Sequence, residues 1–230
     1  MRILPRLKLS PKLINFAYRF VDLEASGEID RPVTRVIEYP FAVQKLGSAQ
    51  GKKVLDIGCT SKWNVLPAML AELGWEVYGI DIREMKFRHP NFHFVGEDIR
   101  HTSFPNDFFD SVCAISTIEH IGLGGRFGVN KDDPQGDVKA VREVQRIIRP
   151  GGTFLVTVPY GQRALVHPLH KVYDKAQLKE LFGAWRTKQE IYYARDEEGY
   201  WEIVTEEEAA LVDNKTSEEA IALLELLSQK

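Results

Sequence analysis

This chain of 230 residues has few cysteines, no excess of positive charge and no long apolar runs. Its two cysteines, Cys59 and Cys113, are too few for a disulfide framework, and they fall in or beside apolar segments. We therefore expect core thiols in a reducing compartment, the cytoplasm. No apolar run approaches the roughly 20 residues that cross a bilayer. The basic start of the chain, interrupted by Pro5 and Pro11, is a poor signal peptide, so we expect no transmembrane segment.

The formal net charge of -3 provides no general basic field for a phosphate polymer. A small-molecule substrate is therefore favoured over a nucleic acid. With 44% hydrophobic residues the chain can bury a full core. We expect an N-terminal helical cap segment over residues 1–48, one main domain over 49–207 and a C-terminal amphipathic helix within 208–230. That helix, centred on 217–227, would pack on the domain or on a second copy of the chain, as in a homodimer.

Five short apolar or β-branched runs alternate with helical patterns along the main domain. They cover residues 52–58, 76–81, 92–97, 110–116 and 153–159. This alternation predicts a Rossmann-like, doubly wound α/β sheet that is mostly parallel, with helices on both faces. A polar turn at 196–199 lies between two further strand patterns, 190–195 and 200–205, and predicts an antiparallel hairpin. The total is then seven strands, the last of them inserted antiparallel.

Three helices are delimited by their ends. The first begins near Asn64 or Val65, carries Pro67 in its first turn and stops at Gly74. A second has Asp137 as its candidate cap, and it ends before Pro150-Gly-Gly152. For the third, Asp174 is the expected cap and Gly183 the expected end.

Two consecutive strands end in an acid, Asp56 in the first and Asp81 in the second, and Gly58 follows the first. A carboxylate at the carboxyl end of a strand can receive an amine or a pair of ribose hydroxyls. Glycine lets a ligand approach the backbone where a side chain would block it. The pattern predicts a nucleotide-type cofactor site at this edge of the sheet.

From about residue 50 to about 205 the chain resembles the class I S-adenosylmethionine-dependent methyltransferases of the small-molecule type. Each matching motif is weak alone, but their order and spacing are specific. The motifs are Val54-Leu-Asp-Ile-Gly-Cys59, Tyr78-Gly-Ile-Asp81, Gly96-Glu-Asp98, Phe109-Asp-Ser-Val-Cys-Ala-Ile-Ser-Thr-Ile-Glu-His120 and Arg149-Pro-Gly-Gly-Thr-Phe-Leu-Val156.

The resemblance implies that S-adenosylmethionine is the cofactor. Asp56 and Gly58 would border its methionine part, Asp81 would accept both ribose hydroxyls and Asp98 would accept the adenine amino group. The full set of cofactor contacts expected from the resemblance is Asp56, Gly58, Cys59, Thr60, Asp81, Ile82, Asp98, Ile99 and Ser116. Alternatively, the three acids only cap or solvate strand ends.

The glycine loop departs from the family pattern, because Thr60 and Lys62 stand where further glycines are usual. Either side chains replace water near the cofactor tail, or the site has lost its ligand. The same departure disfavours a nicotinamide-dependent enzyme, which needs the Gly-x-Gly-x-x-Gly backbone around a pyrophosphate.

The segments after the fourth and fifth strands are expected to meet the acceptor. His120 could accept a proton from an attacking hydroxyl, and His170 is a second candidate base; a packed histidine is the alternative for His120. The substrate contacts that we expect are Glu119, Tyr160, Arg163 and His167. His167 and His170 have the spacing of metal ligands, but no companion cluster accompanies them, so no metal is expected.

Two flanking segments would close the acceptor pocket. The glycine-rich stretch within 122–136 predicts a mobile lid. The N-terminal aromatic residues would cover the pocket, or else form an ordinary helical scaffold; they are Phe16, Tyr18, Phe20, Tyr39 and Phe41.

Methyl transfer to a small molecule, most simply to a hydroxyl oxygen, is the function that we predict. Transfer to nitrogen or carbon is less favoured, and the acceptor itself is not identified. The alternatives are a non-catalytic binding or scaffold protein with the same fold and, less favoured, an RNA methyltransferase, which would need a local basic face.

Overall fold

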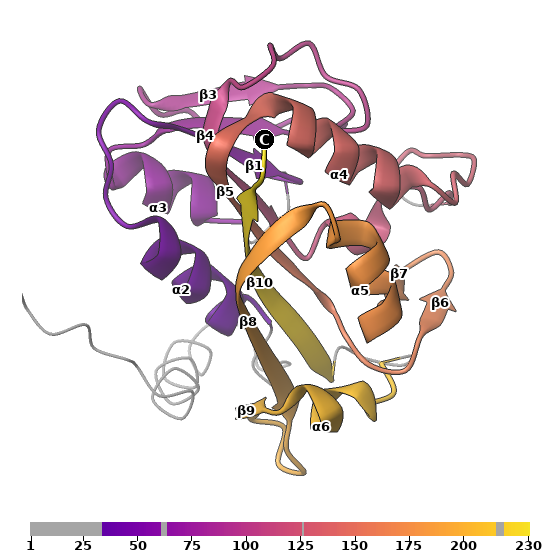
Figure 1. Ribbon diagram of the computed structural model, residues 1–230. Helices are drawn as coiled ribbons and strands as arrows, with labels where there is room; N and C mark the ends of the chain where they lie inside the picture. Colours follow the sequence, from indigo (N-terminus) through magenta and orange to yellow (C-terminus); the bar gives the residue numbers. More distant parts are fainter. Residues whose placement is uncertain (1–33, 61–63, 126, 215–218) are drawn as a thin grey trace, which may run out of the picture.

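A single eight-stranded sheet forms the centre of the computed structural model, which describes residues 34–60, 64–125, 127–214 and 219–230 (Figure 1). The strand order is β3-β2-β1-β4-β5-β10-β8-β9. The strands are β1 (Lys53–Ile57), β2 (Glu76–Ile80), β3 (Phe92–Val95), β4 (Phe109–Ile115), β5 (Ile148–Pro159), β8 (Trp185–Arg195), β9 (Trp201–Val204) and β10 (Ala220–Ser228). Strands β1 to β5 pair in parallel, and β10 is antiparallel to both of its neighbours.

The parallel α/β sheet and the hairpin of β8 and β9 confirm the sequence prediction. The predicted count of seven strands is wrong, because β10 adds an eighth strand between β5 and β8. A separate small hairpin, β6 (Ala164–Val166) with β7 (His170–Val172), lies in the segment that follows β5. The helices are α2 (Arg35–Leu46), α3 (Leu66–Glu72), α4 (Gly136–Ile147), α5 (Lys175–Phe182) and α6 (Glu206–Ala210), with one 3-10 turn, η1 (Ile118–His120).

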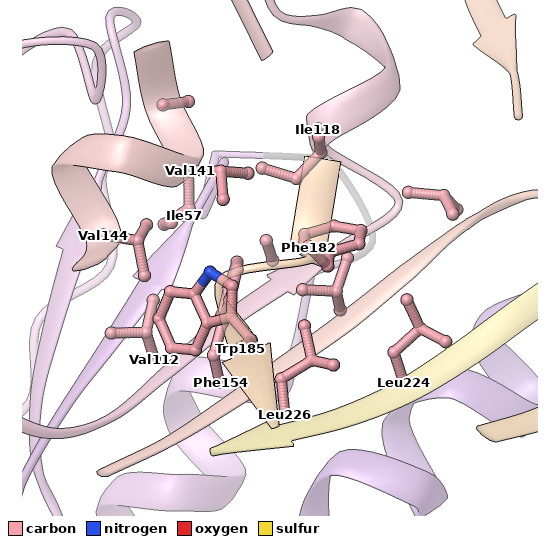
Figure 2. Close-up of a cluster of buried hydrophobic side chains, with 14 of the residues drawn as sticks. Ile57, Val112, Ile118, Val141, Val144, Phe154, Phe182, Trp185, Leu224 and Leu226 are labelled. Atoms are coloured by element: carbon pink, nitrogen blue, oxygen red, sulfur yellow. The ribbon is translucent and has the colours of Figure 1, made fainter. Parts of the chain in front are cut away.

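Helices cover both faces of the sheet, with α2 and α3 on one face and α4 and α5 on the other (Figure 1). Side chains alternate along each strand, so each face has its own hydrophobic core. In β4, for example, Val112 belongs to the core under α4 and α5, whereas Cys113 belongs to the core under α2. Figure 2 shows the core under α4 and α5, in which Phe182 and Trp185 pack near Phe154.

Helix α5 begins as predicted. The Asp174 side chain accepts a hydrogen bond from the backbone N–H of Gln177, and the Gln177 side-chain oxygen accepts one from the backbone N–H of Asp174. The predicted cap of α4 is wrong, because the helix begins at Gly136 and Gln135 is its N-cap. Asp137 instead accepts a hydrogen bond from the Tyr173 hydroxyl at 2.9 Å.

The prediction of a C-terminal helix at 217–227 is wrong. Residues 220–228 form β10, and its buried neighbours on both sides leave almost no exposed face. A continuous apolar run of this length fits a buried strand as well as a helix, and periodicity alone does not separate them. The acid within it, Glu225, is buried and pairs with Lys45 of α2 and Lys188 of β8.

Within the described ranges no helix has the length and apolar composition needed to cross a membrane. Cys59 and Cys113 are buried and unpaired, as predicted. Of the N-terminal aromatic residues, Tyr39 and Phe41 are buried in α2. The other three, Phe16, Tyr18 and Phe20, lie outside the described residues.

Candidate functional site

A cavity of about 370 Å³ opens at the carboxyl ends of β1, β2, β3 and β4. The parallel strands bring their ends to one edge of the sheet, and the loops that follow them form the walls. The loop at residues 121–125 and 127–135, here called the cavity loop, contributes Leu123, Phe127 and Val129. The predicted site residues that line the cavity are Gly58, Asp81, Ile82, Asp98, Ile99, Ser116 and His120.

Gly58 follows β1 directly and has a φ of +78°. A Cβ atom at this position would lie 2.6 Å from the Thr117 hydroxyl oxygen, which is too close for any side chain. That hydroxyl lies 3.1 Å from the carbonyl oxygen of Ile57 and 3.0 Å from that of Ile115. Glycine is required here by both the backbone conformation and the close approach of the ends of β1 and β4.

The ends of β2 and β3 carry the same tripeptide, Asp-Ile-Arg, at 81–83 and at 98–100. In the first, the Asp81 carboxylate accepts hydrogen bonds from Arg83 Nε at 3.0 Å and Nη2 at 2.8 Å. Thr60 adds a hydroxyl donor at 2.6 Å. Burial acts to raise the pKa of Asp81, but the Arg83 and Thr60 donors outweigh it and lower the pKa. Asp81 is therefore an ionised acceptor with internal partners.

Asp98 and Arg100 repeat this geometry. Arg100 Nε lies 3.1 and 3.0 Å from the two Asp98 oxygens, and its Nη2 donates to one of them at 2.6 Å. Both arginines also reach the cavity loop. Arg83 lies over the Phe127 ring at 4.3 Å, and Arg100 Nη1 donates to Asp133 at 2.9 Å. The two tripeptides thus connect the strand-end acids to the loop that covers them.

The other end of the cavity is built by α2 and the end of β4. Arg35 lines the cavity, and its Nη1 donates to Glu38, one turn further along the helix. Glu38 is fully buried and also accepts hydrogen bonds from the hydroxyls of Ser116 and Thr157, each at 2.5 Å. Ser116 has a φ of +40°, which is uncommon for a residue other than glycine. The sequence analysis missed Arg35 and Glu38.

His120 projects into the cavity from η1. Its Nδ1 lies 2.5 Å from the carbonyl oxygen of Leu169, which can only accept, so Nδ1 carries the proton. The other ring nitrogen, Nε2, lies 3.6 Å from a carboxylate oxygen of the buried Glu119. His120 is thus oriented by the β6–β7 hairpin with an acid beside it.

Asp56, Cys59 and Thr60, three predicted cofactor contacts, are not among the described lining residues. The Asp56 side chain is 1% exposed, and Asn64 Nδ2 donates to it at 2.8 Å. Burial raises the pKa of Asp56 to about 7, an effect that the Asn64 hydrogen bond partly opposes. Asp56 therefore lies behind the cavity wall rather than in it.

The remaining predicted acceptor residues lie elsewhere. Tyr160 and Arg163 line a separate groove beside α5 and α6. His167 is exposed and lies 3.3 Å from Asp132 of the cavity loop. The ring of His170 is buried, with Nε2 at 3.2 Å from the Asn214 carbonyl oxygen. The structure therefore does not bring these four residues into the cavity that His120 lines. In the described part of the chain no three His, Cys, Asp or Glu side chains are grouped as a metal site.

Comparison with known proteins gives a family for this geometry. The family described as "Methyltransferase domain" matches residues 28–200. A probable S-adenosylmethionine-dependent methyltransferase of Mycolicibacterium smegmatis is 28% identical over 57% of this chain and 50% of its own length. A ubiquinone biosynthesis O-methyltransferase of Aeromonas salmonicida is 26% identical over 64% of this chain and 60% of its own. The chain thus spans about half the length of the curated relatives that it matches.

Solved structures share the fold. The 1,6-didemethyltoxoflavin-N1-methyltransferase of Burkholderia thailandensis, solved with bound S-adenosylhomocysteine, has a TM-score of 0.53 at 14% sequence identity. The match covers 94% of this chain and 84% of that one. At this identity the likeness shows a common Rossmann-like architecture and nothing about the acceptor.

Proposed function

The chain belongs to the methyltransferase domain family, and on that premise we propose that it transfers a methyl group from S-adenosylmethionine to a hydroxyl oxygen of a small molecule. The observation that carries this proposal is the cavity itself, which is lined by Gly58, Asp81 and Asp98, residues that follow three different strands. Two carboxylates and a glycine without a clashing side chain suit a nucleoside with a cationic tail.

The described residues fit this cofactor. Asp81 has two acceptor oxygens for two ribose hydroxyls, although Arg83 and Thr60 now occupy them, so binding would exchange one set of donors for another. Asp98 would accept the adenine amino group, with Ile99 against the ring. The tail would extend along Gly58 toward Ser116 and Arg35. When bound, S-adenosylmethionine supplies an electrophilic methyl group on a positively charged sulfur.

His120 would hold the proton that the acceptor hydroxyl loses. Because Nδ1 is hydrogen-bonded to a carbonyl oxygen, Nε2 is the nitrogen that can take a proton. Glu119 would stabilise the resulting imidazolium from 3.6 Å. The other contribution of the chain is alignment, with the cavity loop excluding water from the transfer. His170, with its ring buried against Asn214, has the weaker claim to this role.

The relatives support methyl transfer but differ in the atom that is methylated, since they include C- as well as O-methyltransferases. An oxygen acceptor is favoured over an amine by the oriented His120, because a hydroxyl is a weak nucleophile until a base takes its proton, whereas a neutral amine attacks through its own lone pair. Location in the cytoplasm and a homodimer stay predictions from the sequence.

A non-catalytic protein with this fold is the second candidate, and one observation favours it. Asp81 and Asp98 already have arginine partners within the chain, and Asp56 lies outside the cavity. These features are expected of a site that no longer binds a ligand. An RNA methyltransferase has weaker support, since Arg83 and Arg100 in the cavity wall are already paired with acids.

Calorimetry with S-adenosylmethionine and S-adenosylhomocysteine tests the proposal. We expect micromolar binding by the wild type and at least a 100-fold loss in Asp81→Ala, because the ribose hydroxyls lose both acceptors. Asp110→Ala is the matched control. Asp110 is also a strand acid paired with an arginine, Arg149, but it is the second residue of β4, near the opposite edge of the sheet. No binding by folded wild-type protein would favour the non-catalytic candidate.

A further inference from the structure

Glu38 is the buried acid for which the proposed function gives no role. It projects from α2 with an exposed fraction of 0%, among buried apolar neighbours on the same helix. An ionised carboxylate in such a place is costly unless charged or polar donors compensate it. Three donors do so: one carboxylate oxygen accepts from the hydroxyls of Ser116 and Thr157, and the other accepts from Arg35.

Two of these three partners line the cavity. Ser116 lies at the end of β4 in its uncommon backbone conformation, and its N–H donates to the Thr157 hydroxyl at 2.9 Å. Arg35 also lines the cavity, and 23% of its side chain is exposed. Glu38 itself is not a lining residue. Its carboxylate contacts two lining residues from outside the cavity. It thereby holds Arg35 of α2 and Ser116, which follows β4, in a fixed relative position.

Arg35 differs from the other cations of the described cavity wall. Arg83 and Arg100 bind strand-end aspartates in a forked geometry, toward the end where β2 and β3 finish. Arg35 is at the end where β4 finishes, and it has both Glu38 and Glu119 near its charge. Burial acts to lower the pKa of Arg35, but the Glu38 carboxylate offsets this and raises the pKa. The guanidinium therefore stays charged.

We propose that Glu38 is a positioning residue that orients Arg35 to bind a carboxylate, the one carried by the amino-acid tail of the adenosyl cofactor. This inference rests on the proposed function. A zwitterionic tail suits this end, which combines one guanidinium with neighbouring acids. Arg35 offers donors that a carboxylate can accept in pairs, and Glu38 prevents the long side chain from leaving that orientation.

The test compares two ligands that differ in the tail. S-adenosylhomocysteine carries the amino-acid group, and 5′-methylthioadenosine lacks it. In Glu38→Gln, which keeps the size and one acceptor oxygen for the hydroxyls, we expect about tenfold weaker binding of S-adenosylhomocysteine. Binding of 5′-methylthioadenosine should change by less than about twofold. Arg35→Met should show the same split, and the double variant should lose no more than Arg35→Met alone, because the two residues act as one unit.

Glu225→Gln is the matched control. Glu225 is the other buried glutamate that connects α2 to the sheet, through Lys45, but it is not among the lining residues of the cavity. Its replacement should lower the melting temperature and leave the ratio of the two affinities unchanged.

Equal weakening of both ligands in Glu38→Gln, no change in either, or additive losses in the double variant would each overturn the inference. These outcomes are separate from failure of the proposed function. That failure would appear as no adenosyl binding by the wild type, or as no loss in Asp81→Ala.

Discussion

The two ends of the cavity are built in different ways. At the nucleoside end, Asp81 and Asp98 each bond to an arginine two residues along the chain. At the transfer end, Glu38 bonds to Ser116 and Thr157, which are 78 and 119 positions away. The contacts of the nucleoside end form within two short turns, at 81–83 and 98–100. The contacts of the transfer end form only when α2 is packed on the folded sheet. The difference teaches that only the transfer end should depend closely on the stability of the whole fold.

The largest effect is expected from crowding the transfer end. Gly58→Ala adds a Cβ atom 2.6 Å from Thr117 at a φ of +78°, so we expect a loss of about 2–5 kcal/mol in the free energy of unfolding. Gly51→Ala is the control, because Gly51 has a φ of +69° but nothing within 4 Å of the added atom. It should lose only about 1–2 kcal/mol. Urea denaturation measures both.

Equal losses in the two variants would mean that the ends of β1 and β4 can separate without cost. The transfer end would then not depend on close packing between β1 and β4, and the contrast between the two ends of the cavity would be wrong.

The difference in sequence separation also explains how much could be predicted. The five parallel strands and the acids at their ends are encoded in short segments, and the sequence identified them. The sequence analysis did not use the Asp-Ile-Arg tripeptide that occurs at 81–83 and 98–100, and nothing in that pattern says that each arginine turns back on its own aspartate.

The rest depended on tertiary contacts. Glu38 lies in a helix, and only its packing against β4 and β5 reveals what it binds. For the same reason β10 was mistaken for a helix, because its central position in the sheet makes both of its faces apolar. Asp56 was identified as a site residue, but the structure turns it toward Asn64 behind the wall.

A smaller effect is expected from Asp56, through pH. Its pKa is raised from 3.8 in the unfolded chain to about 7 in the fold, so the folded state binds a proton that the unfolded state has released. The resulting stabilisation is fully present below about pH 4 and is lost as pH rises through 7. We expect the free energy of unfolding to fall by about 1.4 kcal/mol per pH unit between roughly pH 5 and 6.5 from this group.

Asp56→Asn should remove that slope, because an amide has no proton to lose, and its benefit should be largest above pH 7. Urea midpoints of both proteins at pH 5, 6 and 7 measure the difference, in which the titration of all other groups cancels. Parallel curves for the two proteins would show that Asp56 is solvated after all, and so belongs to the cavity.

The smallest effect is expected at the nucleoside end, and it would sharpen the comparison. Arg83 occupies the oxygens of Asp81 that the ribose needs, so it acts as an internal competitor that reduces the binding-competent fraction. Arg83→Met should therefore tighten S-adenosylhomocysteine binding by about threefold to tenfold, or roughly 1 kcal/mol. Arg149→Met removes an arginine paired with Asp110 away from the cavity and should leave the affinity unchanged. Weaker binding in Arg83→Met would instead make the arginine, stacked on Phe127, a part of the ligand surface. The nucleoside end would then depend on the cavity loop, just as the transfer end depends on α2. Both ends would in that case be built by contacts between segments that are distant in the sequence.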